Sequence, residues 1–321
     1  MNILVTGGCG YIGATVVRAL NQQKGNKVVI VDDLSFGKQS RVEGTQVYQF
    51  DLARPDARRE LNKIFYEHEI RFVIHFAARK QVGESVKSPE FYYQQNIGGF
   101  VNLLEAMKSS QVNQLVFSSS AAVYGMPEVT GLITESTPKK PINPYGETKL
   151  ITEWMCKDAE TAWGLKYVAL RYFNAAGAAA NDLGDDYALN LIPIVFKKLQ
   201  ENLRPIVFGH DYNTPDGTCV RDYIHVTDLA DAHIKALKYL AFNGEHHAFN
   251  VGTGKGSSVM EVLHAIHDVT QIDFDPRLAA RRPGDPDILV ASNDLIRQEM
   301  DWQPKYDLRD IVQSAWDARA H

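Results

Sequence analysis

The chain has 321 residues, 45% of them hydrophobic and 23% charged, and its formal net charge is −5 at pH 7. These fractions are ordinary for a globular enzyme with a large core, and the acidic balance argues against nucleic-acid partners, which bind a basic face. The three scattered cysteines argue against a disulfide framework and favour a reducing, cytoplasmic location. We expect no signal peptide and no membrane partner, because no apolar run has the length of a membrane span.

In the first half of the chain, short β-branched runs alternate with helical patterns. Strands are predicted at residues 3–6, 27–31, 46–50, 72–76, 114–118 and 166–170, and helices at 12–21, 56–68, 90–108 and 145–163. Strand–helix alternation predicts a parallel sheet covered on both faces, and the nearly all-apolar runs suit strands buried on both sides. The predicted fold class is therefore α/β, a Rossmann-type doubly wound sheet.

The strand–helix rhythm ends after about Gly177. A helix is predicted at 190–200, but turn sequences and paired prolines and arginines dominate the rest of the second half. Only residues 223–252 again read as a helix followed by a strand, and we expect this segment to return to the first domain. The predicted domains are residues 1–177, a dinucleotide-binding domain, and 178–321, a smaller α/β substrate-binding domain.

A glycine-rich motif, VTGGCGYIG, follows the first predicted strand and opens a helix, with glycines at 7, 10 and 13. Such glycines permit a tight turn, a close approach of pyrophosphate to the backbone and close helix–strand packing. Asp32, at the end of the second strand, predicts an acceptor for the adenosine ribose hydroxyls and favours NAD over NADP. Lys38 and Arg41 lie close enough in the sequence to leave NADP open.

Two further acidic residues are cofactor candidates. Asp33 is either a helper of Asp32 or a turn residue. Asp51 ends the third strand and is either a partner of the adenine amino group or the start of an ordinary loop.

The catalytic signal is a YxxxK pattern, Tyr145 and Lys149, on a helix that Asn143 and Pro144 start. Residues four apart lie on one helix face. A cation about 5 Å from the phenol contributes roughly 3 kcal/mol at an effective dielectric constant of about 20. That interaction predicts a phenol pKa lowered from about 10 toward neutrality, as a general base needs. The alternative is an ordinary pair on a helix surface.

Serines at 118, 119 and 120 end the fifth predicted strand, where an open α/β sheet presents ligand-binding groups. The Ser120 hydroxyl is the candidate that hydrogen-bonds both the phenol and a reacting sugar oxygen. The alternative is a serine-rich strand end that satisfies loop backbone. His264 and His267 could share a helix face, but we interpret them as a surface pair and predict no metal.

A series of longer motifs runs through nearly the whole chain: VTGGCGYIG (5–13), HFAARKQVGES (75–85), FSSSAAVYG (117–125), PYGETK (144–149), RYFNAAG (171–177), GTCVRDYIHVTDLADAH (217–233) and RRPGD (281–285). In this order they resemble the extended short-chain dehydrogenase/reductase superfamily and, within it, the UDP-glucose 4-epimerase (UDP-galactose 4-epimerase) family. The resemblance implies NAD-dependent 4-epimerisation of a UDP-hexose through a transient 4-keto sugar, in nucleotide-sugar and galactose metabolism.

The resemblance also implies residue roles. Tyr145 would be the base, Lys149 its electrostatic partner and ribose anchor, and Ser120 the hydroxyl helper. With the glycine motif, the residues expected at the cofactor are Gly7, Gly10, Tyr11, Ile12, Gly13, Asp32, Asp33, Asp51, Leu52, Phe76, Ala77, Ala78, Lys80, Asn96, Ser118, Tyr145, Lys149 and Tyr172. Of these, Lys80 would lie near the phosphates and Tyr172 behind the nicotinamide.

Arginine forks match phosphate oxygens, and the resemblance implies that Arg221 and Arg282 clamp the diphosphate and that Asp285 binds the uridine ribose. The residues expected at the UDP-sugar are Lys80, Ser120, Tyr145, Asn174, Asn190, Leu191, Phe208, Arg221, Arg282, Asp285 and Leu289. The alternative for the two arginines is ordinary surface charge. Cys9 stands where the family carries a small residue, and we expect it to fit.

Neighbouring activities differ at a few positions. Dehydratases of this superfamily carry an acid pair after the hydroxyl residue, whereas Ala121 and Ala122 stand here, so dehydration is disfavoured. The resemblance places Leu289 at the family's sugar-pocket gate, where a tyrosine accompanies plain hexoses and a smaller residue admits N-acetyl sugars. Leucine lies between these in size, which leaves a UDP-GlcNAc/UDP-GalNAc or bifunctional epimerase open. Another sugar-nucleotide oxidoreductase and a non-catalytic NAD-binding regulator also stay open. By analogy, we expect a homodimer through helices at 94–108 and 145–163. Phe100, Leu103 and Leu104 are apolar on the first of these, and packing in the core explains them equally well.

Overall fold

The computed structural model describes all residues except 129–130, 188, 243, 245–246, 283 and 320–321. The chain divides into two compact units. Unit 1 consists of Met1–Gly125, Lys139–Arg171 and Ala230–Phe249, and unit 2 of Met126–Pro138, Tyr172–Leu229 and Asn250–His321. The two predicted domains, residues 1–177 and 178–321, stay a prediction.

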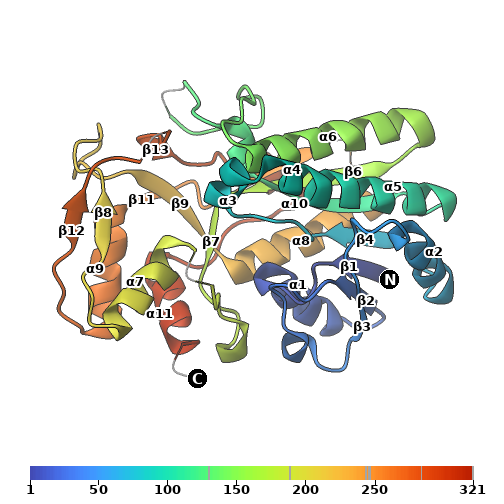
Figure 1. The fold of residues 1–321 in the computed structure, drawn as a ribbon, viewed down its shortest axis with the longest axis horizontal. Coiled ribbons are helices and arrows are strands. Elements are labelled where there is room, and N and C mark those ends of the chain that lie inside the picture. The colour runs from blue at the N-terminus through green and yellow to red at the C-terminus, as the bar shows by residue number, and fades with distance from the viewer. Residues whose placement is uncertain (129–130, 188, 243, 245–246, 283, 320–321) are drawn as a thin grey trace. The chain divides into compact units, whose positions relative to one another are not determined.

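Unit 1 is built on a seven-stranded sheet in the order β10-β6-β5-β4-β1-β2-β3 (Figure 1). The strands are β1 (Asn2–Thr6), β2 (Lys27–Asp32), β3 (Gln46–Gln49), β4 (Phe72–His75), β5 (Gln114–Ser120), β6 (Lys166–Tyr172) and β10 (Ala248–Val251). Adjacent strands from β3 to β5 pair in parallel. The predicted doubly wound α/β class is confirmed.

Helices cover both faces of this sheet because its strands are apolar on both sides. The helical elements are α1 (Tyr11–Asn21), η1 (Gln39–Val42), α2 (Ala57–Glu67), α3 (Val82–Lys87), α4 (Pro89–Tyr92), η2 (Tyr93–Gly98), α5 (Gly99–Ser109), η3 (Ala121–Tyr124), α6 (Pro144–Trp163) and α8 (Val226–Ala241). Apolar side chains of α2, α5 and α6 share one buried cluster with strand residues such as Leu4 and Phe117. On the other face lie α1 and α8 (Figure 1).

The helix predicted at 90–108 is interrupted. Residues 93–98 form a single stretch of π-helix, η2, between α4 and α5. Stretches of π-helix are rare and are frequently found at functional sites. Asn96, within this stretch, is buried.

Unit 2 contains small sheets and helices around a second core. Its elements are β7 (Asn174–Ala176), η4 (Asn181–Leu183), α7 (Leu191–Gln200), β8 (Ile206–Phe208), β9 (Val220–His225), β11 (Gly256–Ser258), α9 (Val259–Thr270), β12 (Arg277–Ala279), β13 (Ile288–Leu289), α10 (Asp294–Met300) and α11 (Leu308–Asp317). One sheet has the order β11-β9-β13 with β7 on β9, and β12 pairs with β8. Phe196 of α7, Ile266 of α9 and Ile311 of α11 are buried in one cluster. The predicted helix at 190–200 is α7.

Candidate active site

The loop between β1 and α1 forms a cradle of backbone. Gly7 has a φ of +70°, and a Cβ there would lie 2.7 Å from the backbone nitrogen of Ala77, beyond the end of β4. A Cβ on Gly13 would collide with the Gly7 carbonyl oxygen, whereas one on Gly10 would meet only that oxygen, at 3.3 Å. The backbone at Gly10 is thus open at the N-terminus of α1, which suits the close approach of a pyrophosphate.

Asp32 is buried at the end of β2 and holds this loop. Its carboxylate accepts hydrogen bonds from the backbone N–H groups of Cys9 and Leu34, each at 2.9 Å. Burial raises the pKa of Asp32, and the two backbone bonds oppose the rise. Cys9 is fully buried beside it, so the side chain fits where a smaller residue was expected.

The segment after β4, which holds Phe76, Ala77, Ala78 and Lys80, is anchored by η2. The Asn96 amide accepts a hydrogen bond from the Arg79 backbone N–H (2.7 Å) and donates to the Arg79 carbonyl (3.0 Å) and to Thr148 Oγ1 of α6 (3.0 Å). Gln81 N–H donates to the Tyr92 hydroxyl at 2.8 Å. Asn96 is therefore a structural clamp, and Lys80 extends from the clamped segment as an exposed side chain.

Local sequence sets the position of Tyr145. Pro144 begins α6 and the Asn143 side chain caps it, accepting from Gly146 N–H at 2.9 Å. A Cβ at Gly146 would lie 2.7 Å from the Ala122 carbonyl oxygen, so glycine lets the start of α6 approach the segment after Ser120. The Ser120 hydroxyl lies close enough to the Tyr145 phenol to lower its pKa.

Lys149 points to the same end of β5. Its Nζ donates to the Ser118 carbonyl at 2.8 Å and lies 5.0 Å from the Phe117 ring centroid and 5.9 Å from that of Tyr145. Tyr145 and Lys149 are both buried. The structure thus brings Ser120, Tyr145 and Lys149 together, as a proton-transfer site requires.

The pKa of the phenol differs from the expectation. Burial raises the pKa of Tyr145, and the hydrogen bond with Ser120 offsets only part of that rise. Burial also lowers the pKa of Lys149 to about 7. The predicted lowering of the phenol pKa by Lys149 is therefore wrong for the protein by itself, because desolvation disfavours both charged forms and outweighs their attraction.

Two buried histidines support this site and were not predicted. His75 Nδ1 lies 2.7 Å from Thr6 Oγ1, and burial, with the charge of Lys149, lowers the pKa of His75 to about 3. His233 of α8 lies 2.9 Å from Ser118 Oγ and packs its ring 4.7 Å from that of Phe76. The Ser118 hydroxyl thus contacts His233, and the Ser118 carbonyl contacts Lys149. The Phe76 ring packs against the His233 ring. The only sequence signal for His233 was that it is the last residue of the 217–233 motif.

Sequence reasoning also passed over three charged side chains of unit 1, Glu153, Arg171 and Arg79, whereas Asp51 was a predicted cofactor candidate. Glu153 of α6 forms a buried ion pair with Arg171 at 2.6 Å and accepts from Ser119 Oγ at 2.6 Å. Arg79, inside the HFAARKQVGES motif, pairs with Asp33 at 2.8 Å. Asp51 accepts from Gln95 Nε2 at 2.9 Å and from Ala53 N–H at 2.8 Å.

The predicted substrate residues of unit 2 lie on its loops and short strands. Arg221 of β9 forms an ion pair with Asp285. The exposed Arg282 lies over the Phe208 ring, with the guanidinium carbon 4.1 Å from the centroid. Asn190 donates to Asp185 at 3.1 Å. Asn174 is exposed, while Leu191 and Leu289 are partly buried. Tyr172, which was predicted at the cofactor, is also partly buried. Pro283 of the RRPGD motif lies outside the described residues.

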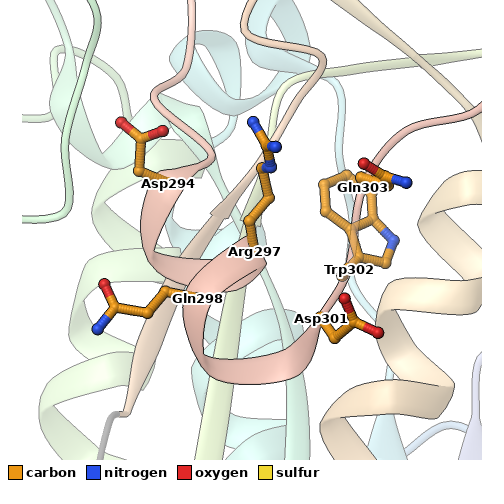
Figure 2. Close-up of a pocket in the computed structure, with 6 residues that line it drawn as sticks. All are labelled: Asp294, Arg297, Gln298, Asp301, Trp302 and Gln303. Carbon is orange, nitrogen blue, oxygen red and sulfur yellow. The ribbon is translucent and has the colours of Figure 1, made fainter.

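Figure 2 shows a separate hollow of unit 2, of about 440 Å³, beside α10. It is lined by Asp294, Arg297, Gln298, Asp301, Trp302 and Gln303. These are not predicted site residues. Among the described residues, no group of three or more His, Cys, Asp or Glu side chains is arranged to hold a metal. No helix in the described part of the chain has the length and apolarity to cross a membrane.

A glycine cradle at one strand end and a Tyr–Lys pair at another define the class of this protein as an extended short-chain dehydrogenase/reductase. Residues 3–252 match the NAD dependent epimerase/dehydratase family. The UDP-glucose 4-epimerase of Halalkalibacterium halodurans is 46% identical over 322 residues, which is 99% of this chain and 95% of that protein.

Solved structures agree. The UDP-glucose 4-epimerase from Brucella ovis in complex with NAD has a TM-score of 0.93 at 41% identity and matches 98% of this chain and 97% of that one. A UDP-glucose-4-epimerase from Stenotrophomonas maltophila with bound NAD and formylated UDP-arabinopyranose has a TM-score of 0.93 at 40% identity, with 100% and 98% covered. The chain therefore belongs to the NAD dependent epimerase/dehydratase family, in the group of the UDP-glucose 4-epimerases. The predicted family and the NAD cofactor are confirmed.

Proposed function

We propose that this protein is an NAD-dependent isomerase that interconverts UDP-glucose and UDP-galactose by inverting C4 of the hexose. The observation that carries the proposal is the meeting of Ser120, Tyr145 and Lys149 at the end of β5, in the same unit as the glycine cradle. Bound NAD supplies the acceptor, and later the donor, of the C4 hydride. Because hydride leaves and returns, the net redox change is zero.

The residues of the chain manage the proton. Tyr145 Oη, in its phenolate form, takes the proton of the C4 hydroxyl as the C4–H bond breaks and hydride leaves, which gives a 4-keto sugar. The resulting phenol returns the proton after the sugar has turned over. The Ser120 hydroxyl lowers the pKa of the phenol and so favours the phenolate. Lys149 supplies a positive charge beside the ring when it is protonated. With a pKa near 7, it can change charge under working conditions.

The UDP end of the substrate is assigned to unit 2. Arg221 and Arg282 are the candidates for the diphosphate, Asp285 for the uridine ribose, and Phe208, Asn174 and Asn190 for neighbouring contacts. Strong binding of UDP and weak binding of the hexose is the arrangement that lets a 4-keto sugar turn over before hydride returns. Ala121 and Ala122 follow Ser120 and carry no acid, which supports epimerisation over loss of water.

The experiment is conversion of UDP-galactose by purified, NAD-loaded protein with no NAD added. UDP-glucose should form with no net change in NADH absorbance. Accumulation of NADH with an oxidised sugar would instead identify a sugar-nucleotide oxidoreductase. Absence of any turnover, with NAD bound, would favour a non-catalytic regulator and contradict the proposal.

A second substrate class is favoured by Leu289, a partly buried residue of β13. Leucine is smaller than the tyrosine expected with plain hexoses, so UDP-GlcNAc and UDP-GalNAc are candidate substrates. The same assay with acetylated and plain UDP-hexoses decides between a plain and a bifunctional epimerase. A Leu289→Tyr variant should lose activity on the acetylated pair first.

We also infer a homodimer and a cytoplasmic location. Helices α5 and α6 contact each other, and each exposes a large apolar side chain, Val101 at 40% and Trp154 at 56%. Burying such side chains against a second copy is favourable. Phe100, Leu103 and Leu104 of α5 are instead buried within the subunit. Sedimentation of wild type and of Trp154→Glu tests the dimer, which the charge should weaken.

A further inference from the structure

Arg79 makes a contact network that the proposed function does not use. Its Nη2 lies 2.8 Å from Asp33 Oδ2 and its Nη1 donates to Ser35 Oγ at 2.7 Å. The Gln95 side-chain oxygen accepts from Nε at 3.3 Å and from Nη2 at 3.2 Å. Gln95 in turn donates to Asp51. The guanidinium therefore joins the loop after β4 to the loop after β2, and through Gln95 of η2 it is connected to the loop after β3.

The strand order shows what this network spans. Arg79 follows β4, Asp33 and Ser35 follow β2, and Asp51 follows β3, while β1 lies between β4 and β2. The Arg79–Asp33 pair thus passes from one neighbour of β1 to the other, at the carboxyl edge where the glycine loop begins. Dinucleotides bind at this edge, with the adenosine ribose at the acidic residue that ends β2. That residue is Asp32, next to Asp33 in the chain.

Both partners of the ion pair are held by further contacts. The Arg79 side chain is 16% exposed and that of Asp33 29% exposed, so the pair is partly shielded from water. The rings of Phe36 and Phe91 lie 5.6 Å and 5.5 Å from the guanidinium carbon, within the range of cation–π attraction. The Arg79 backbone is held by Asn96, and both Asp33 oxygens are used, since Ser35 N–H donates to Oδ1 at 2.9 Å.

We propose that Arg79 retains the cofactor: its pairing with Asp33, Ser35 and Gln95 closes the loops after β2, β3 and β4 around the adenosine end of bound NAD. The proposal rests on the proposed function, because an epimerase that returns every hydride has no need to exchange NAD between turnovers. Departure of NAD then requires the charge-assisted contacts of Arg79 to break. Arg79 is thus a positioning residue that governs cofactor release.

The experiment measures NAD release, not epimerisation. NAD-loaded wild type, Arg79→Leu, Arg79→Lys and Asp33→Asn proteins are diluted, and the free NAD is followed by enzymatic cycling. We expect release about tenfold faster in Arg79→Leu and Asp33→Asn, the scale of one charge-assisted contact, and an intermediate rate in Arg79→Lys, which keeps the charge but not the fork. The double variant should release NAD no faster than Arg79→Leu alone, because that substitution already removes the contact with Asp33.

The matched control is Arg58→Leu, which removes an arginine paired with Glu105 in an exposed ion pair on α2 and α5. Arg58→Leu should release NAD at the wild-type rate. Only variants whose NAD-free form has the same thermal stability as the NAD-free wild type enter the comparison. Equal release from wild type and Arg79→Leu overturns the proposal. Faster NAD binding by Arg79→Leu with an unchanged release rate also overturns the proposal, because Arg79 would then obstruct the entry of the adenosine end of NAD. If wild-type protein holds no NAD, the proposed function itself fails, which is a separate result.

Discussion

The two units hold their candidate residues in opposite ways. In unit 1, Asp32, Asn96, Ser118 and Lys149 are buried and hydrogen-bonded to the backbone or to one another. In unit 2, Asn174, Asn190 and Arg282 are exposed. Arg221 and Asp285 there satisfy each other. The cofactor and proton-transfer groups are fixed in advance, whereas those assigned to the UDP end lie on loops and short strands, and several are exposed.

This difference matches what a C4 epimerase has to do. Hydride and proton transfer need atoms placed to a fraction of an ångström, which rigid, desolvated groups provide. A sugar that must present both faces needs contacts that leave it free, with affinity supplied elsewhere on the substrate. Substitutions in unit 1 should therefore change rate or folding stability, and those in unit 2 should change binding.

The largest effect is expected at Tyr145. Tyr145→Phe removes the group that carries the proton, and kcat should fall about a thousandfold, within the range for general acid–base groups. The protein should still bind NAD, since the cradle is untouched. Tyr66→Phe is the control, because Tyr66 is 87% exposed on α2. If kcat of Tyr145→Phe stayed within a few-fold of wild type, Tyr145 of unit 1 would not be the group that transfers the proton.

The next effect tests the rigidity of unit 1 through its buried ion pair. Glu153→Gln leaves Arg171 buried without its carboxylate and takes the charged partner from Ser119 Oγ, next to Ser120. The free energy of unfolding should fall by about 3 kcal/mol in urea denaturation. The exposed Glu105→Gln, which loses its pair with Arg58, should cost less than about 1 kcal/mol.

Replacing both partners sharpens this test. The double variant Glu153→Leu, Arg171→Met removes both charges, so no unpaired charge is left, although Ser119 Oγ and the Tyr124 hydroxyl lose a partner. It should be more stable than Glu153→Gln alone. If the single variant were as stable as wild type, the pair would contribute nothing to the stability of unit 1. The contrast with the exposed pairs would then disappear.

A third prediction concerns pH and the buried amine. Burial lowers the pKa of Lys149 to about 7 in the folded protein, while an unfolded lysine has a pKa of about 10.4. Between these values the unfolded chain binds one proton more, so stability rises with pH, by at most about 1.4 kcal/mol per unit. As pH falls from 9 to 7, NAD-free wild type should lose stability relative to Lys149→Met.

The control for that measurement is Lys63→Met, which removes an exposed lysine paired with Glu60. Its stability difference from wild type should stay constant over the same pH range. A constant difference for Lys149→Met as well would mean that water reaches the amine. Desolvation would then not be what separates this site from the exposed residues of unit 2.

Much of unit 1 could be predicted because its strands are long apolar runs. β1 to β6 begin and end within two residues of the predicted limits, and Asn143 with Pro144 marked the start of α6. In unit 2, β11, β12 and β13 have only two or three residues, too few for a periodic pattern. Their positions depend on pairing with distant strands, as β13 pairs with β9.

The candidate site shows the same limit. The glycine spacing and the Tyr145–Lys149 pair follow from local geometry, so sequence could predict them. The π-helix around Asn96 and the pairing of Arg79 with Asp33, 46 residues earlier, depend on tertiary contacts. The sign of the Tyr145 pKa shift was predicted wrongly because burial, which the sequence does not show directly, outweighs the charge of Lys149.

The smallest effect should come from unit 2. Arg282→Ala removes a guanidinium that lies over Phe208 and is assigned to the diphosphate. KM for UDP-glucose should rise about tenfold with kcat nearly unchanged, because the lost contact is equal in the ground and transition states. Arg277→Ala, an exposed arginine on β12, is the control and should leave both constants near wild type. A fall in kcat without a change in KM would show that Arg282 acts on the reaction itself. In that case the division between a catalytic unit 1 and a binding unit 2 would be wrong at this residue.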